Sequence, residues 1–236
     1  MRDFAIMMGS APVWRSWEHV LHSVRTGEPA FDHVYGVPVF EHYARDPEAA
    51  AVGVAGLHSR SVAENDAVVA AVDLGDARTL LDVGGGRGSL VRAFLAAHPH
   101  LRATLFDLAH VVRDGEEDER LSLVAGDFFA AVPGAHDVVV LKKVLHDWPD
   151  EQVTTILRGC AADLPGDGRV LVVENLVTPG NTPSFAKWLD LLMLVYAGGR
   201  ERTEADFRAL LAEAGLALRR VVPTATGISV LEATHA

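Results

Sequence analysis

The feature that most constrains the fold is an alternation of short apolar runs with helical stretches, from Thr79 to the end of the chain. The apolar runs are short and rich in Val and Leu, as strands buried on both faces require. The stretches between them carry apolar residues at helical spacing. Strands that alternate with helices in this way build a mostly parallel sheet with helices on both faces, so we predict an α/β fold.

We predict seven strands, and the last two follow each other closely enough to pair antiparallel at one edge of the sheet. The predicted strands are 79–83, 102–106, 121–125, 137–141, 169–173, 216–222 and 228–232. The predicted helices between them are 89–97, 150–163, 184–196 and 204–214.

The first 65 residues show a different pattern and are predicted to be helical. Trp14, Trp17, Leu21 and Val24 recur every three to four residues, which places them on one stripe of a helix. A stripe of four large apolar residues indicates a core or a partner interface. We therefore expect the chain to divide after residue 65.

Charge and composition argue against several classes of partner. The formal net charge of −11 leaves no basic stripe for nucleic-acid phosphates. The single cysteine, Cys160, excludes an internal disulfide and favours a reducing compartment. There is no apolar run of about 18 residues and no signal-peptide pattern at the N-terminus. We expect a cytoplasmic protein with neither nucleic acid nor membrane as its partner.

Ionisable residues lie at the ends of five consecutive predicted strands. They are Asp82, Asp107, Asp127, His146 and Glu174 in chain order. In open parallel sheets, ligands bind outside the carboxyl ends of the strands, so these five residues predict a site at one edge. We expect the first of them, Asp82, to be structural and to bond backbone amides of the glycine-rich turn that follows it.

The glycine-rich turn predicts close approach of a ligand to the backbone. Gly84, Gly86 and Gly88 follow the first strand, and the helix after them directs its N-terminal N–H groups at the ligand. The dinucleotide pattern would require glycine where Ser89 stands, which disfavours NAD. Asp107 lies 23 residues after Gly84, a spacing that suits a carboxylate bound to ribose hydroxyls, with a helix N-cap as the alternative.

Five segments together resemble one family, the caffeic-acid-type O-methyltransferases and their bacterial relatives that tailor aromatic polyketides and antibiotics. The resemblance covers nearly the whole chain. It implies a Rossmann-like class I methyltransferase fold, with S-adenosylmethionine as cofactor and S-adenosylhomocysteine as product. Residues 66–236 would form the catalytic domain that binds the cofactor, after a helical remnant of the family's dimerisation and substrate-lid region at 1–65. The segments are LLDVGGGRGSL (80–90), LFDLAHVV (105–112), GDFF (126–129), LKKVLHDWPDEQ (141–152) and GGRERTEADF (198–207).

The resemblance also implies roles for individual residues. His146 matches the family's general base, Glu174 and Glu201 match the two carboxylates that orient it, and Met193 would pack against the aromatic acceptor. The residues implied to contact the cofactor are Gly84, Asp107, Asp127, Phe128 and Lys142. Gly84 would contact the methionine part, Asp107 the ribose hydroxyls, and Asp127 and Phe128 the adenine.

A neutral histidine suits this chemistry. The sulfonium methyl is already activated, so the protein must align it with the acceptor and remove the acceptor's proton. A phenol has a pKa near 10 and histidine one near 6.5, so neutral His146 can take the proton as the methyl transfers, worth about 10²–10⁴-fold. A carboxylate on the other ring nitrogen fixes the tautomer. No metal is required, and no ligand cluster with metal-like spacing is evident.

The resemblance has one departure, and other functions stay open. Family members carry a longer N-terminal region that closes the partner's substrate pocket in a homodimer, and this chain begins late in that region. We therefore expect a homodimer or pairing with another chain. The alternatives are a relative that binds S-adenosylmethionine without methylating, a truncated scaffold subunit, and a nicotinamide dehydrogenase. An amine acceptor instead of a hydroxyl is also open.

Overall fold

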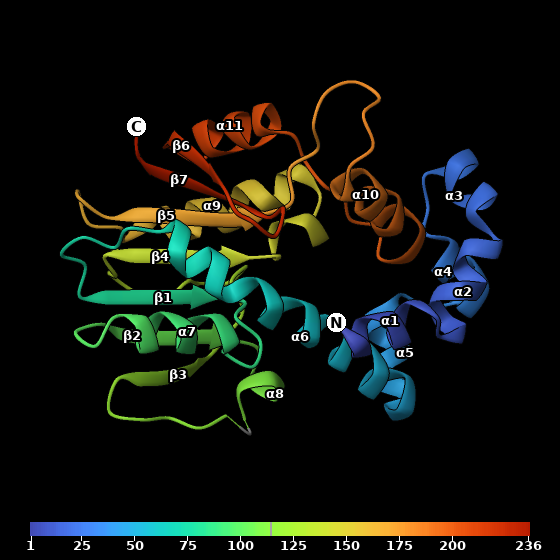
Figure 1. Ribbon diagram of the computed structural model, residues 1–236, viewed down its shortest axis with the longest axis horizontal. Coiled ribbons are helices and arrows are strands. Elements are labelled where there is room, and N and C mark those ends of the chain that lie inside the picture. Colours follow the sequence, from blue (N-terminus) through green and yellow to red (C-terminus); the bar gives the residue numbers. More distant parts are fainter. Residues whose placement is uncertain (114) are drawn as a thin grey trace. The chain divides into compact units, whose positions relative to one another are not determined.

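The computed structural model describes residues 1–113 and 115–236, and the chain divides into two compact units. The first unit comprises Met1–Ala63 and Val177–Glu201, and the second comprises Glu64–Leu176 and Arg202–Ala236. The first unit is helical, and the second holds the sheet (Figure 1). The segment Val177–Glu201 groups with the N-terminal helices, an insertion that the alternation of strands and helices does not reveal.

The second unit is built on a seven-stranded sheet of order β3-β2-β1-β4-β5-β7-β6. The first five strands are mutually parallel, and β7 runs antiparallel to both β5 and β6. The prediction of a mostly parallel sheet with an antiparallel pair at one edge is therefore confirmed. The strands are β1 Thr79–Val83, β2 Arg102–Asp107, β3 Leu121–Ala125, β4 Val138–Lys142, β5 Arg169–Glu174, β6 Leu216–Pro223 and β7 Ser229–His235.

Helices cover both faces of this sheet. Neighbouring residues of β1 point to opposite faces, so Leu80 enters the apolar cluster that includes residues of α6 and α7, and Leu81 enters the cluster with α9 and α11. Both leucines are fully buried, which explains why the strands are continuous apolar runs. The covering helices are α6 Pro47–Ala71, α7 Ser89–Ala97, α9 Asp150–Ala162 and α11 Glu204–Glu213. Two short elements follow strands β2 and β4, α8 Ala109–Val112 and the 3₁₀ turn η1 Leu145–Asp147.

A capping box fixes where α11 begins. The Thr203 hydroxyl accepts a hydrogen bond from the Asp206 N–H at 3.2 Å, and the Asp206 carboxylate accepts one from the Thr203 N–H at 2.9 Å. Two N–H groups that the first turn of a helix leaves unbonded are thereby satisfied. The cap holds the residue just before it, Arg202, whose side chain reaches the candidate site.

The first unit consists of short helices around a small core. Val13, Leu189 and Leu192 form that core, with Trp17 and Tyr196 among the residues packed against it. Within the described residues, no helix is long and apolar enough to cross a bilayer. The helices are α1 Arg2–Met8, α2 Ala11–Glu18, α3 Val20–Thr26, α4 Ala30–Tyr35, α5 Val39–Arg45 and α10 Phe185–Tyr196, with the first part of α6.

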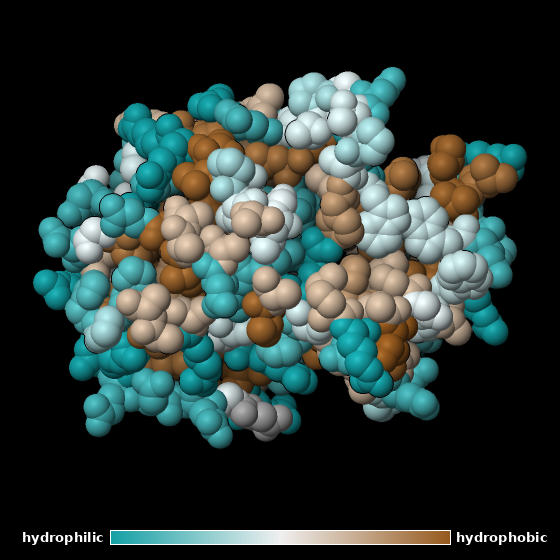
Figure 2. Space-filling model, viewed as in Figure 1, coloured by the Kyte–Doolittle hydropathy of each residue, from teal (hydrophilic) through white to brown (hydrophobic). Residues whose placement is uncertain are grey.

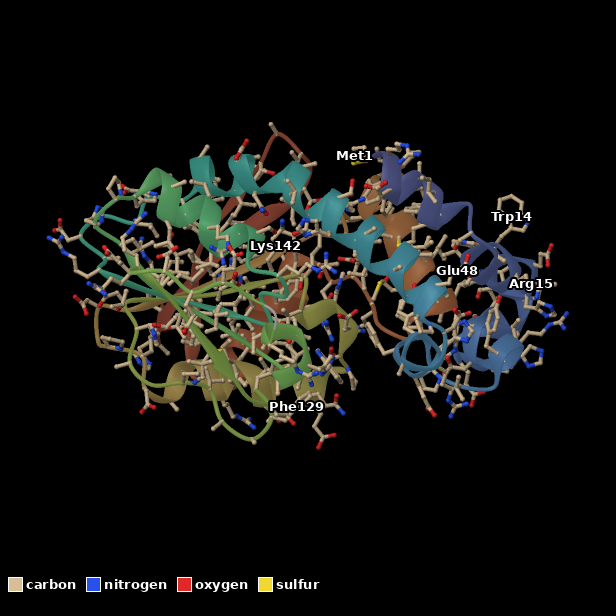
Figure 3. The ribbon with its side chains drawn as sticks, turned by 90° about the horizontal axis from the view of Figure 1, so that it is seen from below. Met1, Trp14, Arg15, Glu48, Phe129 and Lys142 are labelled. Carbon is tan, nitrogen blue, oxygen red and sulfur yellow. The ribbon has the colours of Figure 1, made fainter. Side chains whose placement is uncertain are left out.

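The predicted single stripe from Trp14 to Val24 is wrong. The chain leaves helical geometry at His19, with φ −104° and ψ 18°, and this break separates α2 from α3. The two helices therefore share no continuous face. Trp14, Leu21 and Val24 are 63%, 59% and 64% exposed, and Trp14 projects outward in Figure 3. Apolar side chains consequently lie on the surface of this unit (Figure 2).

Candidate active site

The glycine turn after β1 needs two of its glycines for different reasons. Gly84 and Gly86 have φ of +67° and +60°, in the left-handed region that favours glycine. A Cβ on Gly84 would lie 2.8 Å from Val144 Cγ2, so this glycine lets the segment after β4 pack against the turn. A Cβ on Gly86 would meet nothing within 4 Å. The turn is therefore open at Gly86, as a backbone cradle for a ligand requires.

Asp107 is held against this turn. Its Oδ2 accepts a hydrogen bond from the Gly86 N–H at 2.8 Å, and its Oδ1 accepts one from the Leu108 N–H at 2.7 Å. The N-cap residue of α8 is Leu108, which makes no side-chain cap, so the N-cap alternative for Asp107 is wrong. Each carboxylate oxygen keeps a further lone pair, so the carboxylate can still accept hydrogen bonds from two hydroxyls.

An aromatic cluster lies beside Asp127. The Asp127 carboxylate accepts a hydrogen bond from the Phe129 N–H at 2.9 Å, which shapes the loop after β3. The ring of Phe128 lies edge-on to Phe129 and Trp148, with centroid distances of 4.8 and 5.9 Å. Phe129 is 36% exposed and lies at the surface in Figure 3. The three rings present an apolar wall suited to a flat heterocycle. No role for Phe129 or Trp148 is predicted from the sequence, although both lie in the family segments.

Asp82 departs from its expected structural role. The side chain is buried, and its carboxylate oxygens accept no hydrogen bond from the glycine turn, so the predicted bonds are absent. Burial raises the pKa of Asp82 to about 7, against the opposing effects of the Lys142 charge and the Val91 backbone N–H. Asp82 pairs with Val140 in the neighbouring strand, and Gly84 packs against Val144, so the segment from Lys142 to Val144 lies near the glycine turn. The role of Lys142 in lining a ligand site stays a prediction.

His146 lies against a buried carboxylate. The Glu174 side chain, fully buried at the end of β5, accepts hydrogen bonds at Oε1 from the Leu145 N–H at 3.1 Å and the His146 N–H at 3.4 Å. Its Oε2 lies 3.7 Å from His146 Nδ1, and Asp147 Oδ1 lies 3.6 Å from His146 Nε2. The structure thus brings His146 and Glu174 together. Their carboxylate–imidazole arrangement can orient the ring and stabilise its protonated form.

Arg202 fixes the segment that carries His146. Its buried guanidinium donates to the Leu145 carbonyl at 2.8 Å and to the Trp148 carbonyl at 2.7 Å. It also donates twice to Asp150 Oδ1, at 3.0 and 2.7 Å. The rigid fork of donors suits this set of acceptors. This role could not be predicted from the sequence, because Arg202 follows Glu201 and precedes a helix, which gives no sign of partners so far back in the chain.

Glu201 and Met193 belong to the first unit. The Glu201 N–H donates to Asp190 Oδ1 at 2.9 Å, and the Glu201 side chain is buried. Burial raises the pKa of Asp190, and the neighbouring Glu201 charge adds to this effect. Met193 is buried on α10, and its carbonyl accepts hydrogen bonds from the Ala197 and Gly198 N–H groups at the end of that helix. The roles of Glu201 and Met193 at the site stay predictions.

Comparison with known proteins places this geometry in context. Residues 17–217 match a family model described as an O-methyltransferase domain. A phenazine O-methyltransferase from Lysobacter antibioticus is 42% identical, over 99% of this chain and 70% of that protein. The chain spans between 56% and 70% of the length of the curated relatives that it matches.

Solved structures agree in fold. A methyltransferase of calicheamicin biosynthesis, solved with S-adenosylhomocysteine bound, superposes with a TM-score of 0.93 at 35% identity, covering 100% of this chain and 72% of that one. An O-methyltransferase of neocarzinostatin biosynthesis, solved with S-adenosylmethionine and 2-hydroxy-5-methyl naphthoic acid, superposes with a TM-score of 0.82 at 34% identity, covering 97% and 71%. The Rossmann-like class I fold predicted from the sequence is therefore confirmed.

Proposed function

The chain belongs to the O-methyltransferase family, and from this premise we propose that it methylates a hydroxyl group of an aromatic small molecule with S-adenosylmethionine as donor. The observation that carries the proposal is the pair His146 and Glu174, placed at the carboxyl end of the sheet with the glycine turn and Asp107. Relatives named for a phenazine and solved with a naphthoic acid support an aromatic natural product as the acceptor.

The residues at the strand ends fit this cofactor. Its sulfonium supplies an activated methyl group when it is bound. We propose that Asp107 binds the ribose hydroxyls, that Asp127 and Phe128 flank the adenine, and that Gly84 and Lys142 contact the methionine part. The fit is supported by the open backbone at Gly86 and by a carboxylate fixed against the same turn.

The proton of the acceptor hydroxyl would pass to His146. Glu174 lies on the Nδ1 side of the ring, so we propose that Nδ1 carries the hydrogen in the resting state and that Nε2 takes the acceptor's proton. The resulting imidazolium would be stabilised by Glu174 and Asp147. Glu201 directly precedes Arg202, whose guanidinium is bonded to the Leu145 and Trp148 carbonyls on either side of His146. We propose that the Glu201 carboxylate is the second group that orients the His146 imidazole. Met193 would pack against the acceptor ring.

The test compares the unaltered chain with His146→Gln, which keeps a polar side chain without a base. Hydroxylated naphthoic acids and phenazines serve as acceptors, with methyl ether and S-adenosylhomocysteine measured together by mass spectrometry. We expect equal amounts of both products, and a turnover about 10²–10⁴-fold lower in the variant. Affinity for S-adenosylmethionine, measured by calorimetry, should be unchanged. A converted acceptor without S-adenosylhomocysteine would favour the non-methylating alternative, and failure to bind the cofactor would overturn the proposal.

We also infer that the first unit pairs with a second copy of this chain or with another chain. Large apolar side chains at Trp14, Leu21, Val24 and Phe40 are each about three-fifths exposed, which favours a partner over solvent. Light scattering at several concentrations should give a mass above that of one chain.

A cytoplasmic location is proposed because the one cysteine, Cys160, is unpaired and buried, as a reducing compartment allows.

A further inference from the structure

Four charged or polar side chains form a buried cluster at the end of β4. Lys142 Nζ donates to Asn65 Oδ1 at 2.7 Å and lies 3.4 Å from Glu64 Oε2. Lys143 Nζ lies 2.7 and 2.8 Å from the two oxygens of the same Glu64 carboxylate. The Lys142 and Glu64 side chains are only 4% and 6% exposed, so water contributes little to their solvation.

An unusual backbone conformation brings both lysines to one carboxylate. Consecutive residues of a strand point to opposite faces of the sheet, so Lys142 and Lys143 would ordinarily diverge. Lys143 instead has φ +55°, the one positive φ among the described residues other than glycine. A left-handed conformation costs about 1–2 kcal/mol for such a residue and persists where its surroundings require it. The conformation turns the Lys143 ammonium back to Glu64, and strain of this kind gathers at functional sites.

The cluster lies where the amino-acid end of the cofactor would bind. Asp82 pairs with Val140, Gly84 packs against Val144, and the Asp82 charge acts on Lys142, so Lys142 lies near the glycine turn. Two ammonium groups face the Glu64 carboxylate, and burial keeps the neighbouring Asp82 carboxyl partly protonated near neutral pH, so cationic donors lie near the glycine turn. Such donors suit the carboxylate of an amino acid and have no complement in an adenosine group.

We propose that Glu64 and Asn65 of α6 are positioning residues that hold the Lys142 ammonium toward the amino-acid end of S-adenosylmethionine. The inference rests on the proposed function, because it needs that cofactor at the glycine turn. Neither Glu64 nor Asn65 need touch the cofactor. Their part is to fix one ammonium group that would otherwise keep the freedom of a four-carbon side chain.

Calorimetric binding of three ligands tests the proposal. S-adenosylmethionine and S-adenosylhomocysteine carry the amino-acid end, and 5′-methylthioadenosine shares their adenosine part but lacks it. Asn65→Leu removes the acceptor for Lys142, whereas Asn65→Gln keeps an uncharged amide oxygen on a side chain one methylene longer. We expect Asn65→Leu to weaken the first two ligands about tenfold, as for one lost hydrogen bond to a charged group. The affinity for 5′-methylthioadenosine should stay unchanged, and Asn65→Gln should bind the first two ligands more tightly than Asn65→Leu does.

A pH series gives a readout that a purely structural role would not move. Burial lowers the pKa of Lys142 to about 8, with Glu64 raising it, Lys143 lowering it and Asp82 raising it. The ammonium is lost as the pH rises through that value, so affinity for S-adenosylhomocysteine should fall above pH 8. Glu64→Gln removes the main influence that keeps the pKa up, and should move this fall to lower pH. The ligand's own amino group titrates equally in both proteins.

The outcomes separate the two proposals. If the unaltered chain binds neither adenosyl amino acid, the proposed function fails and this inference fails with it. If it binds both and Asn65→Leu binds them equally well, the proposed function stands and the positioning role is overturned. An equal loss of all three ligands would also overturn it, because the effect would then be one on the whole site and not on its amino-acid end.

Discussion

Ionisation of the buried Asp82 should destabilise the folded chain, and Asp82→Asn measures by how much. Burial raises the pKa of this carboxyl from 3.8 to about 7, while the unfolded chain keeps the ordinary value. Between these two pH values the folded chain holds a proton that the unfolded chain has released. The free energy of unfolding therefore falls as the pH rises. Integrated from pH 5 to pH 8, the loss is about 2–3 kcal/mol.

Urea unfolding of both proteins at pH 5, 6.5 and 8 tests this value. Asparagine has nearly the same shape and does not titrate, so the stability of Asp82→Asn relative to the unaltered chain should grow by about 2–3 kcal/mol from pH 5 to pH 8. Groups that titrate in both proteins cancel in this difference. The titration of Lys142 adds to this stability difference, because loss of the Asp82 charge in the variant lowers the pKa of Lys142 further. A difference that is constant across this range would refute the reasoning.

Three further substitutions test the buried arginine and two other carboxylates. Arg202→Met should lower the free energy of unfolding by about 2–4 kcal/mol, because it removes the guanidinium hydrogen bonds to the Leu145 and Trp148 carbonyls and to Asp150. Asp150→Asn should cost less, because that side chain is half exposed, and urea unfolding compares the two. The pKa of Asp137 is shifted in the opposite direction from that of Asp82. Burial opposes ionisation of Asp137, but hydrogen bonds from the Arg78 and Thr79 N–H groups outweigh this effect and lower the pKa. Asp137→Asn should therefore cost about 1 kcal/mol at pH 7, and this cost should vanish as the pH falls below 4.

The sheet could be predicted from the sequence because each strand is determined by residues that are neighbours in the sequence. Each strand is a continuous apolar run bounded by polar residues, and a mostly parallel sheet has to bury both faces. His146 and Glu174 could be predicted in the same way, since residues that follow neighbouring parallel strands meet at the carboxyl edge of the sheet. The prediction needed only the strand ends and the order of the strands, and not the conformation of any side chain.

Long-range pairing explains what the sequence did not reveal. The carbonyl partners of Arg202 lie 54 and 57 residues earlier in the chain, and the partner of Lys142 on α6 lies 77 residues earlier. No spacing rule connects such positions. The helix break at His19 was also invisible, because the apolar period from Trp14 to Val24 continues through it. Only the packing of Val13 in place of Trp14 shows that the period does not describe a buried face.

The strain at Lys143 can be measured directly with two substitutions that both remove the ammonium. Lys143→Gly and Lys143→Ala lose the same contact with Glu64, so their difference isolates the cost of φ +55°. In the left-handed region alanine is strained by about 1–2 kcal/mol and glycine is not. Glycine, however, loses about 0.5–1 kcal/mol more than alanine in backbone conformational entropy on folding. The glycine variant should therefore be the more stable by about 0.5–1 kcal/mol in urea unfolding.

The matched control is the same pair of substitutions at Lys142, whose backbone lies in a regular strand. There alanine should be the more stable, because only the entropy difference remains. Reversal of the order between two neighbouring positions would show that the surrounding fold holds position 143 in the left-handed conformation even without the ammonium. If alanine is the more stable at both positions, the left-handed conformation is not strained, and the buried cluster loses the backbone argument for its function.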